Sequence, residues 1–104
     1  MTGHSLGGAL ATLTTMSLIR VGIPVEQLIN FGSPRVGDDK FAAFVDTKLK
    51  QINVLRHTHR KDIVPHLPGS FFPFNFHHIS TEVFEDKNNN YTLCNGGEDK
   101  NCAD

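Results

Sequence analysis

The pentapeptide Gly-His-Ser-Leu-Gly at residues 3–7 constrains the fold of this chain more than any other segment. It fits the pattern Gly-x-Ser-x-Gly, in which a buried strand turns sharply into a helix and exposes the hydroxyl of the central serine. We expect both glycines, Gly3 and Gly7, to be required, because the tight turn leaves no space for a side chain against the neighbouring strand and helix. The pattern therefore predicts a strand-to-helix junction at Ser5.

The residues after this junction predict alternating helices and strands. Leu6, Leu10, Leu13 and Ser17 fall at spacings of 4, 3 and 4 residues, as on one face of a helix ending near residue 20. A short apolar run at residues 28–32 is suited to a strand buried on both faces. A second helix is expected from residue 38 or 39 to about residue 50, followed by a strand at residues 52–58. This order favours a parallel sheet.

The C-terminal part of the sequence is less regular. Residues 65–78 are rich in proline, glycine, histidine and phenylalanine and do not fit a long helix. Residues 81–84 and 91–94 predict a β-hairpin around a loop at 86–90. The phenylalanine-rich run at 71–76 fits either a lipid-contacting rim or core that covers the edge of the sheet, and we expect core.

Length and charge exclude several classes of protein. The chain has 104 residues, room for one small domain. A net charge of −1 and a pI of about 6.6 give no electrostatic case for binding nucleic acid or an anionic membrane surface. There is no apolar run long enough for a transmembrane helix, and no signal peptide is visible within these residues.

Two features near the C-terminus bear on the cellular compartment. The spacing of Cys94 and Cys102 fits either a short-loop disulfide or two free thiols. A disulfide would indicate an oxidising compartment. Asn90 begins an Asn-Tyr-Thr motif and is therefore a candidate glycosylation site. Together these features favour an extracellular protein.

Ser5 needs partners before it can act as a nucleophile. A base must accept its proton, and a carboxylate must orient that base. In α/β-hydrolases, whose nucleophile elbow has the pattern found here, the three residues follow in the order Ser, Asp or Glu, His. Asp62 is the expected carboxylate because it lies just beyond the strand at 52–58, where catalytic groups gather in parallel sheets. His78 follows Asp62 in the correct order.

Four segments resemble the fungal-type, class 3 lipases in the order that this family shows. They are residues 2–11 around the elbow, residues 31–37 (Phe-Gly-Ser-Pro-Arg-Val-Gly), residues 62–68 (Asp-Ile-Val-Pro-His-Leu-Pro), and His78 with residues 82–84. The resemblance implies a partial α/β-hydrolase fold, with parallel strands alternating with helices and a C-terminal β-hairpin. Residues 1–104 would then be the central fragment of one class 3 lipase catalytic domain.

The resemblance also implies roles for individual residues. Ser5 would be the nucleophile, Asp62 the triad carboxylate and the backbone N–H of Leu6 an oxyanion donor. It further implies that Cys94 and Cys102 form a disulfide. The family's catalytic histidine follows the second cysteine, so the general base is expected outside these 104 residues. His78 is then a packing and hydrogen-bonding residue, and only the second choice for the base.

The expected function is a carboxylic-ester hydrolase acting on triacylglycerol at a lipid–water interface. Within the family, phospholipase A1 and feruloyl esterase activities are the alternatives. Outside it, the alternatives are a non-catalytic remnant of a lipase gene and a binding module that uses the aromatic run. We expect the fragment alone to be inactive and poorly folded, since the lid, the second oxyanion donor and the base are absent, and we expect the truncation to be a gene-model artefact.

A zinc site built from the histidines is the remaining alternative chemistry. No cysteine or carboxylate is placed to complete such a site. We therefore expect no metal and no cofactor. The histidines concerned are His57, His59, His66, His77 and His78.

Overall fold

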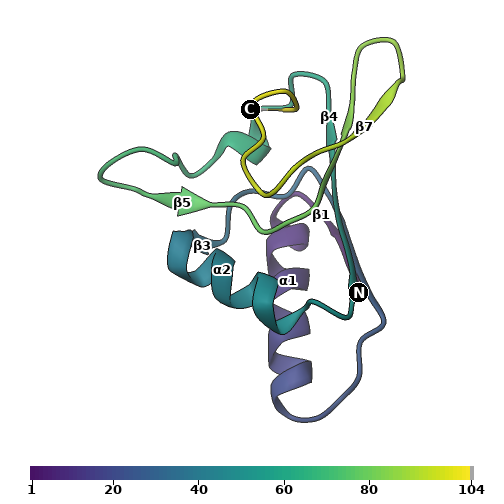
Figure 1. Cartoon of the computed structure of the whole chain (residues 1–104), viewed down its shortest axis with the longest axis vertical. Coiled ribbons are helices and arrows are strands. Elements are labelled where there is room, and N and C mark those ends of the chain that lie inside the picture. The colour runs from purple at the N-terminus through teal and green to yellow at the C-terminus, as the bar shows by residue number, and fades with distance from the viewer. Residues whose placement is uncertain (104) are drawn as a thin grey trace.

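The computed structural model describes residues 1–103 and contains one mixed five-stranded sheet (Figure 1). The strands lie in the order β1-β2-β4-β6-β7; the first four are parallel, and β7 is antiparallel to β6. Strands β3 and β5 form a separate antiparallel pair. The elements are β1 (Thr2–His4), α1 (Leu6–Arg20), β2 (Gln27–Phe31), β3 (Gly37–Asp38), α2 (Asp39–Lys48), β4 (Asn53–His59), the 3-10 helix η1 (Val64–His66), β5 (Phe76–His77), β6 (Glu82–Glu85) and β7 (Tyr91–Leu93).

The order of elements expected from the sequence is confirmed, including the parallel strands and the C-terminal hairpin of β6 and β7. The boundaries differ by one or two residues. Of the two predicted starts for the second helix, the structure selects residue 39, because the carboxylate of Asp38 accepts the N–H of Phe41 at 2.8 Å and caps the helix. No helix within residues 1–103 is long and apolar enough to cross a membrane.

Helix α1 packs on the sheet through its small residues and not through its leucines. The residues it buries are Gly8, Ala9, Ala11, Thr12 and Thr15. Leu6 is 67% exposed, and Leu10 and Leu13 are also exposed. The leucine spacing thus predicted the helix correctly, but the leucines lie on its exposed face and not on the face that packs against the sheet. The reason is steric: only small side chains allow the helix backbone to approach the strands this closely.

Both helices cover the same face of the sheet (Figure 1). Leu28 of β2 is paired with Val54 of β4, so their side chains point to the same face. Both pack into one core cluster with residues of α1 and α2, whose buried members are Ala11, Leu28, Ala42, Val45, Leu49 and Ile79. The hydrophobic core therefore lies between the strands and the two helices.

The opposite face of the sheet, which we call the open face, is not covered by a helix within residues 1–103. Strand β2 buries Leu28 and Asn30, whereas Phe31 is 42% exposed. The expectation that this strand is buried on both faces is therefore wrong for the described residues. By strand register, the open face consists of Thr2, His4, Gln27, Ile29, Phe31, Asn53, Leu55, His57, His59, Val83, Glu85, Tyr91 and Leu93.

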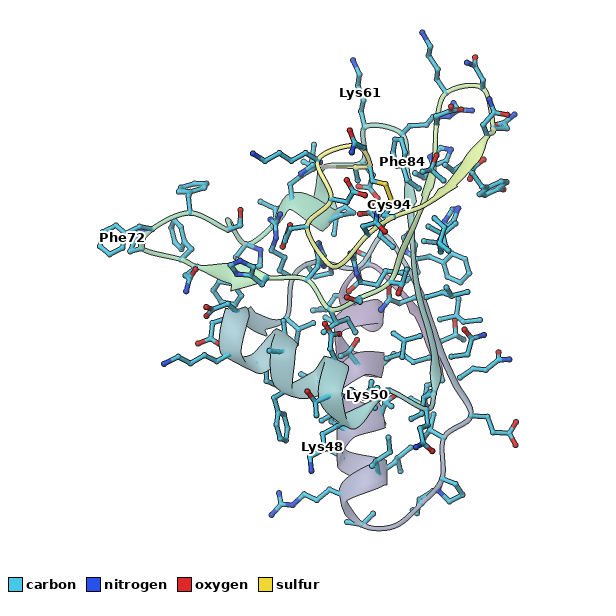
Figure 2. All side chains as sticks on the ribbon, viewed as in Figure 1. Lys48, Lys50, Lys61, Phe72, Phe84 and Cys94 are labelled. Carbon is cyan, nitrogen blue, oxygen red and sulfur yellow. A yellow bond between two sulfur atoms is a disulfide. The ribbon has the colours of Figure 1, made fainter. Side chains whose placement is uncertain are left out.

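The phenylalanine-rich run projects from the fold and does not contribute to the core. Phe72 is 92% exposed and lies at the far end of the loop (Figure 2). Phe71 and Phe74 are also exposed, and their rings contact each other edge to face at 5.9 Å between centroids. The expectation of core is therefore wrong, because the loop between η1 and β5 extends away from the sheet edge it was expected to cover.

Candidate active site

Ser5 occupies a strained backbone position between β1 and α1. Its φ of 55° and ψ of −127° lie outside the regions that residues with a side chain usually adopt. The N–H of Ser5 donates to the carbonyl of Phe31 at 2.9 Å, and the carbonyl of Ser5 accepts the N–H of Gly8 at 2.9 Å. The Ser5 hydroxyl makes no capping bond to the helix. The backbone is therefore fixed on both sides of Ser5, while the side chain is left for other chemistry.

Gly3 and Gly8 make this turn possible. A Cβ on Gly3 would overlap the carbonyl oxygen of Gly7, and a Cβ on Gly8 would lie 2.8 Å from the Cβ of Ser33. By contrast, a Cβ on Gly7 would meet no described atom within 4 Å. The expectation that Gly7 is required for space is thus wrong within the described residues, and Gly8 takes that role.

Leu6 is the first residue of α1, so its backbone N–H has no acceptor in a preceding helical turn. The aligned peptide dipoles also give this end of the helix a partial positive charge. The N–H follows Ser5 directly in the sequence. The local structure is therefore suited to stabilise negative charge that develops on an oxygen beside Ser5.

Asp62 lies beyond β4, at the same edge of the sheet as Ser5. Its Oδ1 accepts the N–H of Val64 at 3.0 Å, which starts the turn into η1. Its Oδ2 lies directly above Gly32, where a Cβ would come within 2.8 Å of it. Gly32 follows β2, the strand between β1 and β4, and has a φ of 59° that favours glycine. Ser5 and Asp62 therefore lie on either side of the end of β2.

His78 is buried and bound on two sides. Its Nε2 lies 2.6 Å from the carbonyl oxygen of Pro65, and its backbone N–H donates to Glu98 at 2.8 Å. Burial, reinforced by the positive charge of Arg56, lowers the pKa of His78 to about 3. The ring is therefore neutral near pH 7, and its Nε2 must carry the hydrogen that binds Pro65. This arrangement agrees with a packing and hydrogen-bonding residue.

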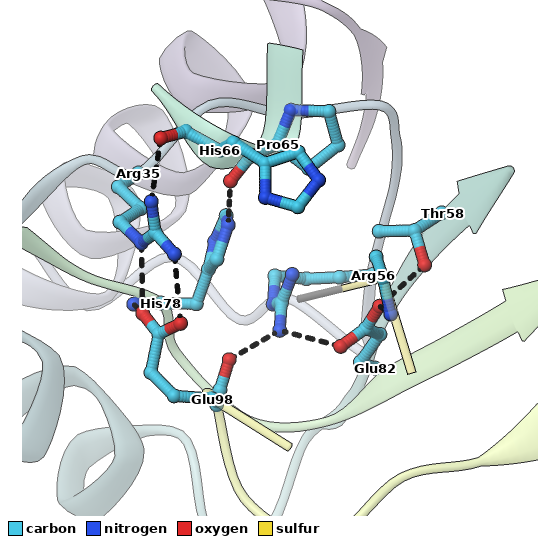
Figure 3. Close-up of a pocket in the computed structure, with 10 residues that line it drawn as sticks. Arg35, Arg56, Thr58, Pro65, His66, His78, Glu82 and Glu98 are labelled. Atoms are coloured by element: carbon cyan, nitrogen blue, oxygen red, sulfur yellow. Dashed lines mark hydrogen bonds and ion pairs between the residues drawn. The ribbon is translucent and has the colours of Figure 1, made fainter. Parts of the chain in front are cut away.

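Arg35 is buried and binds the segment that follows Asp62 (Figure 3). Its Nη1 donates to the carbonyls of His66 and Pro68 at 2.7 and 3.0 Å, and its backbone N–H donates to the carbonyl of Leu67 at 2.7 Å. The other edge of the guanidinium forms two hydrogen bonds with Glu98, at 2.8 and 2.9 Å. Burial raises the pKa of Glu98, but the bonds from Arg35 and from the N–H of His78 outweigh it and leave the pKa below its ordinary value.

Arg56 forms the centre of a second group of buried polar side chains, close to the group around Arg35. It donates to the carbonyls of Ile79 and Gly97 at 2.6 and 3.0 Å and lies 3.8 Å from the carboxylate of Glu82. Glu82 also accepts bonds from the hydroxyl of Thr58 and from a backbone N–H near the C-terminus. Burial lowers the pKa of Arg56 to about 10, partly countered by the nearby carboxylates, so the guanidinium stays charged near pH 7.

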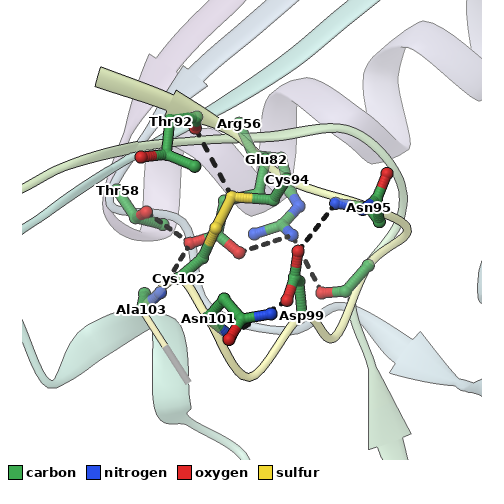
Figure 4. Close-up of a disulfide and its surroundings, with 11 residues drawn as sticks. Arg56, Thr58, Glu82, Thr92, Cys94, Asn95, Asp99, Asn101, Cys102 and Ala103 are labelled. Atoms are coloured by element: carbon green, nitrogen blue, oxygen red, sulfur yellow. Dashed lines mark hydrogen bonds and ion pairs between the residues drawn. A yellow bond between two sulfur atoms is a disulfide. The ribbon is translucent and has the colours of Figure 1, made fainter.

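Cys94 and Cys102 form a disulfide (Figure 4), which confirms the pairing implied by the family resemblance. The loop between them is organised by Asp99, whose carboxylate accepts the N–H groups of Asn95 and Asn101, both at 2.9 Å. These bonds hold the pKa of the Asp99 carboxyl below its usual range. The loop carries Glu98 towards Arg35 and His78.

The five histidines considered for zinc do not gather into a cluster of ligands among residues 1–103. His57 instead lies 3.1 Å from Glu85, with its ring against Phe31 and Tyr91 on the open face. The group with ligand spacing in the described chain is Glu82 with Cys94 and Cys102. Both of its sulfurs are joined in the disulfide, so neither is a thiolate that could bind a metal.

Three residues of the site, Gly32, Arg35 and Glu98, were not predicted from the sequence. Gly32 and Arg35 belong to the segment at residues 31–37 that was noted only for its resemblance. Glu98 lies in the cysteine loop, and its pairing with Arg35 spans 63 residues of sequence. The position of Arg35 three residues after Gly32, in a turn beyond a strand, was a usable signal for Arg35, whereas no local signal pointed to Glu98.

Comparisons with known proteins agree with this geometry. The family model described as "Lipase (class 3)" matches residues 1–72. A secreted mono- and diacylglycerol lipase from Fusarium solani is 44% identical over 86 residues, which are 83% of this chain and 24% of that protein. A phospholipase A1 from rice is 41% identical over 83 residues, covering 69% of this chain and 19% of that protein.

Solved structures give the same result. Lipase II from Rhizopus niveus superposes with a TM-score of 0.86 at 35% identity, covering 98% of this chain and 39% of that one. A Rhizomucor miehei triacylglyceride lipase superposes with a TM-score of 0.83 at 35% identity, covering 98% and 40%. Measured against the full length of the curated relatives, the chain spans about a quarter. Its sheet and helices are part of an α/β-hydrolase fold, and the chain belongs to the class 3 lipase family.

Proposed function

We propose that residues 1–104 form part of the catalytic domain of a serine carboxylic-ester hydrolase, with Ser5 as nucleophile and Asp62 as triad carboxylate. The observation that carries the proposal is the position of these two residues at one edge of the sheet, where they follow β1 and β4 on either side of β2, with Asp62 above Gly32. The strained backbone at Ser5 supports it, because such strain is characteristic of catalytic positions.

In the proposed reaction, the Ser5 hydroxyl attacks the ester carbonyl while a histidine accepts its proton. Asp62 orients that histidine, and the N–H of Leu6 donates to the oxyanion. Water then hydrolyses the acyl-enzyme. We place the histidine outside these 104 residues, since the Nε2 of His78 is bound to the carbonyl of Pro65 and a pKa of about 3 makes its ring too weak a base near pH 7. The 104 residues by themselves should then show no measurable esterase activity, as loss of a general base costs about 10²–10⁴ in rate.

The proposed substrates are acylglycerols, which the printed names of several relatives support. Phospholipid acyl esters are the second candidate, supported by the rice phospholipase A1. The proposed setting is a lipid–water interface. In its favour, the chain that follows Asp62 exposes apolar side chains, two close to it in sequence and three in the projecting loop; they are Ile63, Leu67, Phe71, Phe72 and Phe74. Such a patch beside a catalytic edge is suited to contact lipid.

We further propose that the protein is extracellular and glycosylated on Asn90. Secreted relatives and the disulfide support the compartment. Asn90 is exposed in the loop before β7, whose turn is held by Asp86 accepting the N–H groups of Asn88 and Asn90 at 2.7 and 3.0 Å. In a yeast secretory host, Thr92→Ala should abolish a glycosidase-sensitive mass shift that Thr92→Ser and Asn88→Gln retain. A shift that persists in Thr92→Ala would contradict glycosylation at Asn90.

The proposed activity is tested with the protein expressed from its natural transcript. Ser5→Ala should abolish hydrolysis of emulsified triacylglycerol and labelling by a serine-directed fluorophosphonate. Asp62→Asn should lower kcat by about 10³–10⁴ with little change in KM. Ser17→Ala, on the exposed surface of α1, is the matched control and should leave both readouts unchanged. Unchanged hydrolysis in Ser5→Ala would exclude this mechanism.

A further inference from the structure

The segment that carries Asp62 is anchored through four consecutive carbonyl groups, those of residues 65–68. Pro65 is bound by the ring of His78, whereas the next three carbonyls are bound by Arg35, two by its guanidinium and one by its backbone N–H. Asp62 is connected to this anchored stretch by the single turn of η1 and by its own bond to Val64. The N–H of Asp62 also donates to the carbonyl of His59, the last residue of β4, at 3.1 Å. The position of its carboxylate therefore depends on β4 on one side and on the stretch bound by Arg35 on the other.

Arg35 is in turn oriented by Glu98. The two parallel hydrogen bonds, at 2.8 and 2.9 Å, fix the plane of the guanidinium as well as its position. With one edge of the guanidinium occupied by Glu98, Nη1 is directed at the carbonyls of His66 and Pro68. Glu98 also accepts the N–H of His78, so one carboxylate orients both groups that bind the carbonyls.

The disulfide loop holds Glu98 in place. Cys94 and Cys102 close the loop, and Gly97 packs so tightly that a Cβ would overlap the carbonyl oxygen of His78. Arg56 binds the carbonyl of Gly97 at 3.0 Å. The loop is thus docked by covalent, steric and charged contacts at the residue next to Glu98.

We propose that Glu98 and Arg35 are positioning residues for Asp62, and that the Cys94–Cys102 loop sets the catalytic geometry through them. This inference rests on the proposed function, since it requires Asp62 to be the triad carboxylate. A displaced Asp62 would misorient the histidine that it binds, which lowers the rate of acylation without weakening ester binding.

The test uses the protein expressed from its natural transcript and a soluble p-nitrophenyl ester. Glu98→Gln keeps the shape of the side chain but removes the charge, and it should lower kcat about ten- to hundredfold with KM unchanged. Arg35→Lys should do the same, because an ammonium group cannot bind a carboxylate in two places and two carbonyls at once. Glu26→Gln, an exposed acid before β2, is the matched control and should leave kcat unchanged. Melting temperatures show whether each variant folds.

A purely structural role is separated by repeating Glu98→Gln in an Asp62→Ala background. If Glu98 acts through Asp62, the second substitution should have no further effect on kcat. An equal loss in both backgrounds, or no loss in either, would overturn the inference. If Asp62→Ala itself leaves kcat unchanged, the proposed function fails; if Asp62→Ala lowers kcat and Glu98→Gln does not, only this inference fails.

Discussion

The two halves of the candidate site differ in how the chain holds them. Ser5 is held by backbone hydrogen bonds and by the close approach of α1 to the strands, which requires glycine at positions 3 and 8. Asp62 is held by a neighbouring segment that is bound to buried charged side chains and to a disulfide loop. Steric packing does not change with pH or redox state, whereas ion pairs and disulfides do. The Asp62 half should therefore be the half that responds to solution conditions.

The largest effect is expected from Gly3→Ala, which tests the steric half. The added methyl group would overlap the backbone carbonyl of Gly7 and should destabilise the protein by about 4 kcal/mol or more. Gly7→Ala is the matched control, because its methyl group meets no described atom, and alanine favours a helix over glycine by about 1 kcal/mol. Urea unfolding of both variants checks this difference. Equal destabilisation would contradict the inference that a methyl group has no room at Gly3 but has room at Gly7.

The second-largest effect concerns the Asp62 half of the site. Replacing both cysteines, Cys94→Ser with Cys102→Ser, should lower the free energy of unfolding by about 2–3 kcal/mol, since the disulfide closes a loop with a sequence separation of 8 residues. Hydrogen exchange would locate the change. The amides of Val64, His66 and Leu67 should lose protection, while amides in the second half of α1 should keep it. Uniform loss of protection over both regions would remove the distinction between the two halves.

The smallest change, when counted per pH unit, is a pH dependence of stability that arises from His78. Its pKa is about 3 in the folded protein against an ordinary 6.5, so between these values the unfolded chain binds a proton that the folded protein does not. The contribution to stability is complete above about pH 6.5 and falls with decreasing pH, by up to about 1.4 kcal/mol per pH unit. Between about pH 7 and pH 4, the free energy of unfolding should change less steeply with pH for His78→Gln than for the unmodified protein. An unchanged slope would assign the dependence to another group.

The sequence predicted those features that depend on local pattern. The elements could be predicted because hydrophobic spacing and turn residues are local, and the disulfide because the family resemblance covers both cysteines. The buried face of α1 could not be predicted from hydrophobicity, since the helix packs through residues chosen for small volume, such as Gly8 and Ala11. The Arg35–Glu98 pair joins distant segments, and neither residue carries a local signal of its partner.

The site followed the same rule. Ser5 and Asp62 were predicted as site residues from motifs, because each follows a strand and the carboxyl ends of parallel strands meet at one edge. The groups that hold the Asp62 segment could not be predicted from the sequence. They include backbone carbonyls such as those of His66 and Pro68, and every residue has such a carbonyl. Only the folded chain shows which of them are bound and by what.

The open face gives the chain a built-in optical reporter. These 104 residues contain a single tyrosine and no tryptophan. Tyr91 lies on the open face, is largely exposed, and has its ring 6.0 Å from that of His57. Intrinsic fluorescence of the chain therefore comes from one position on the uncovered side of the sheet. Any polypeptide that comes to cover this side would change the emission of Tyr91 without the need for an attached dye.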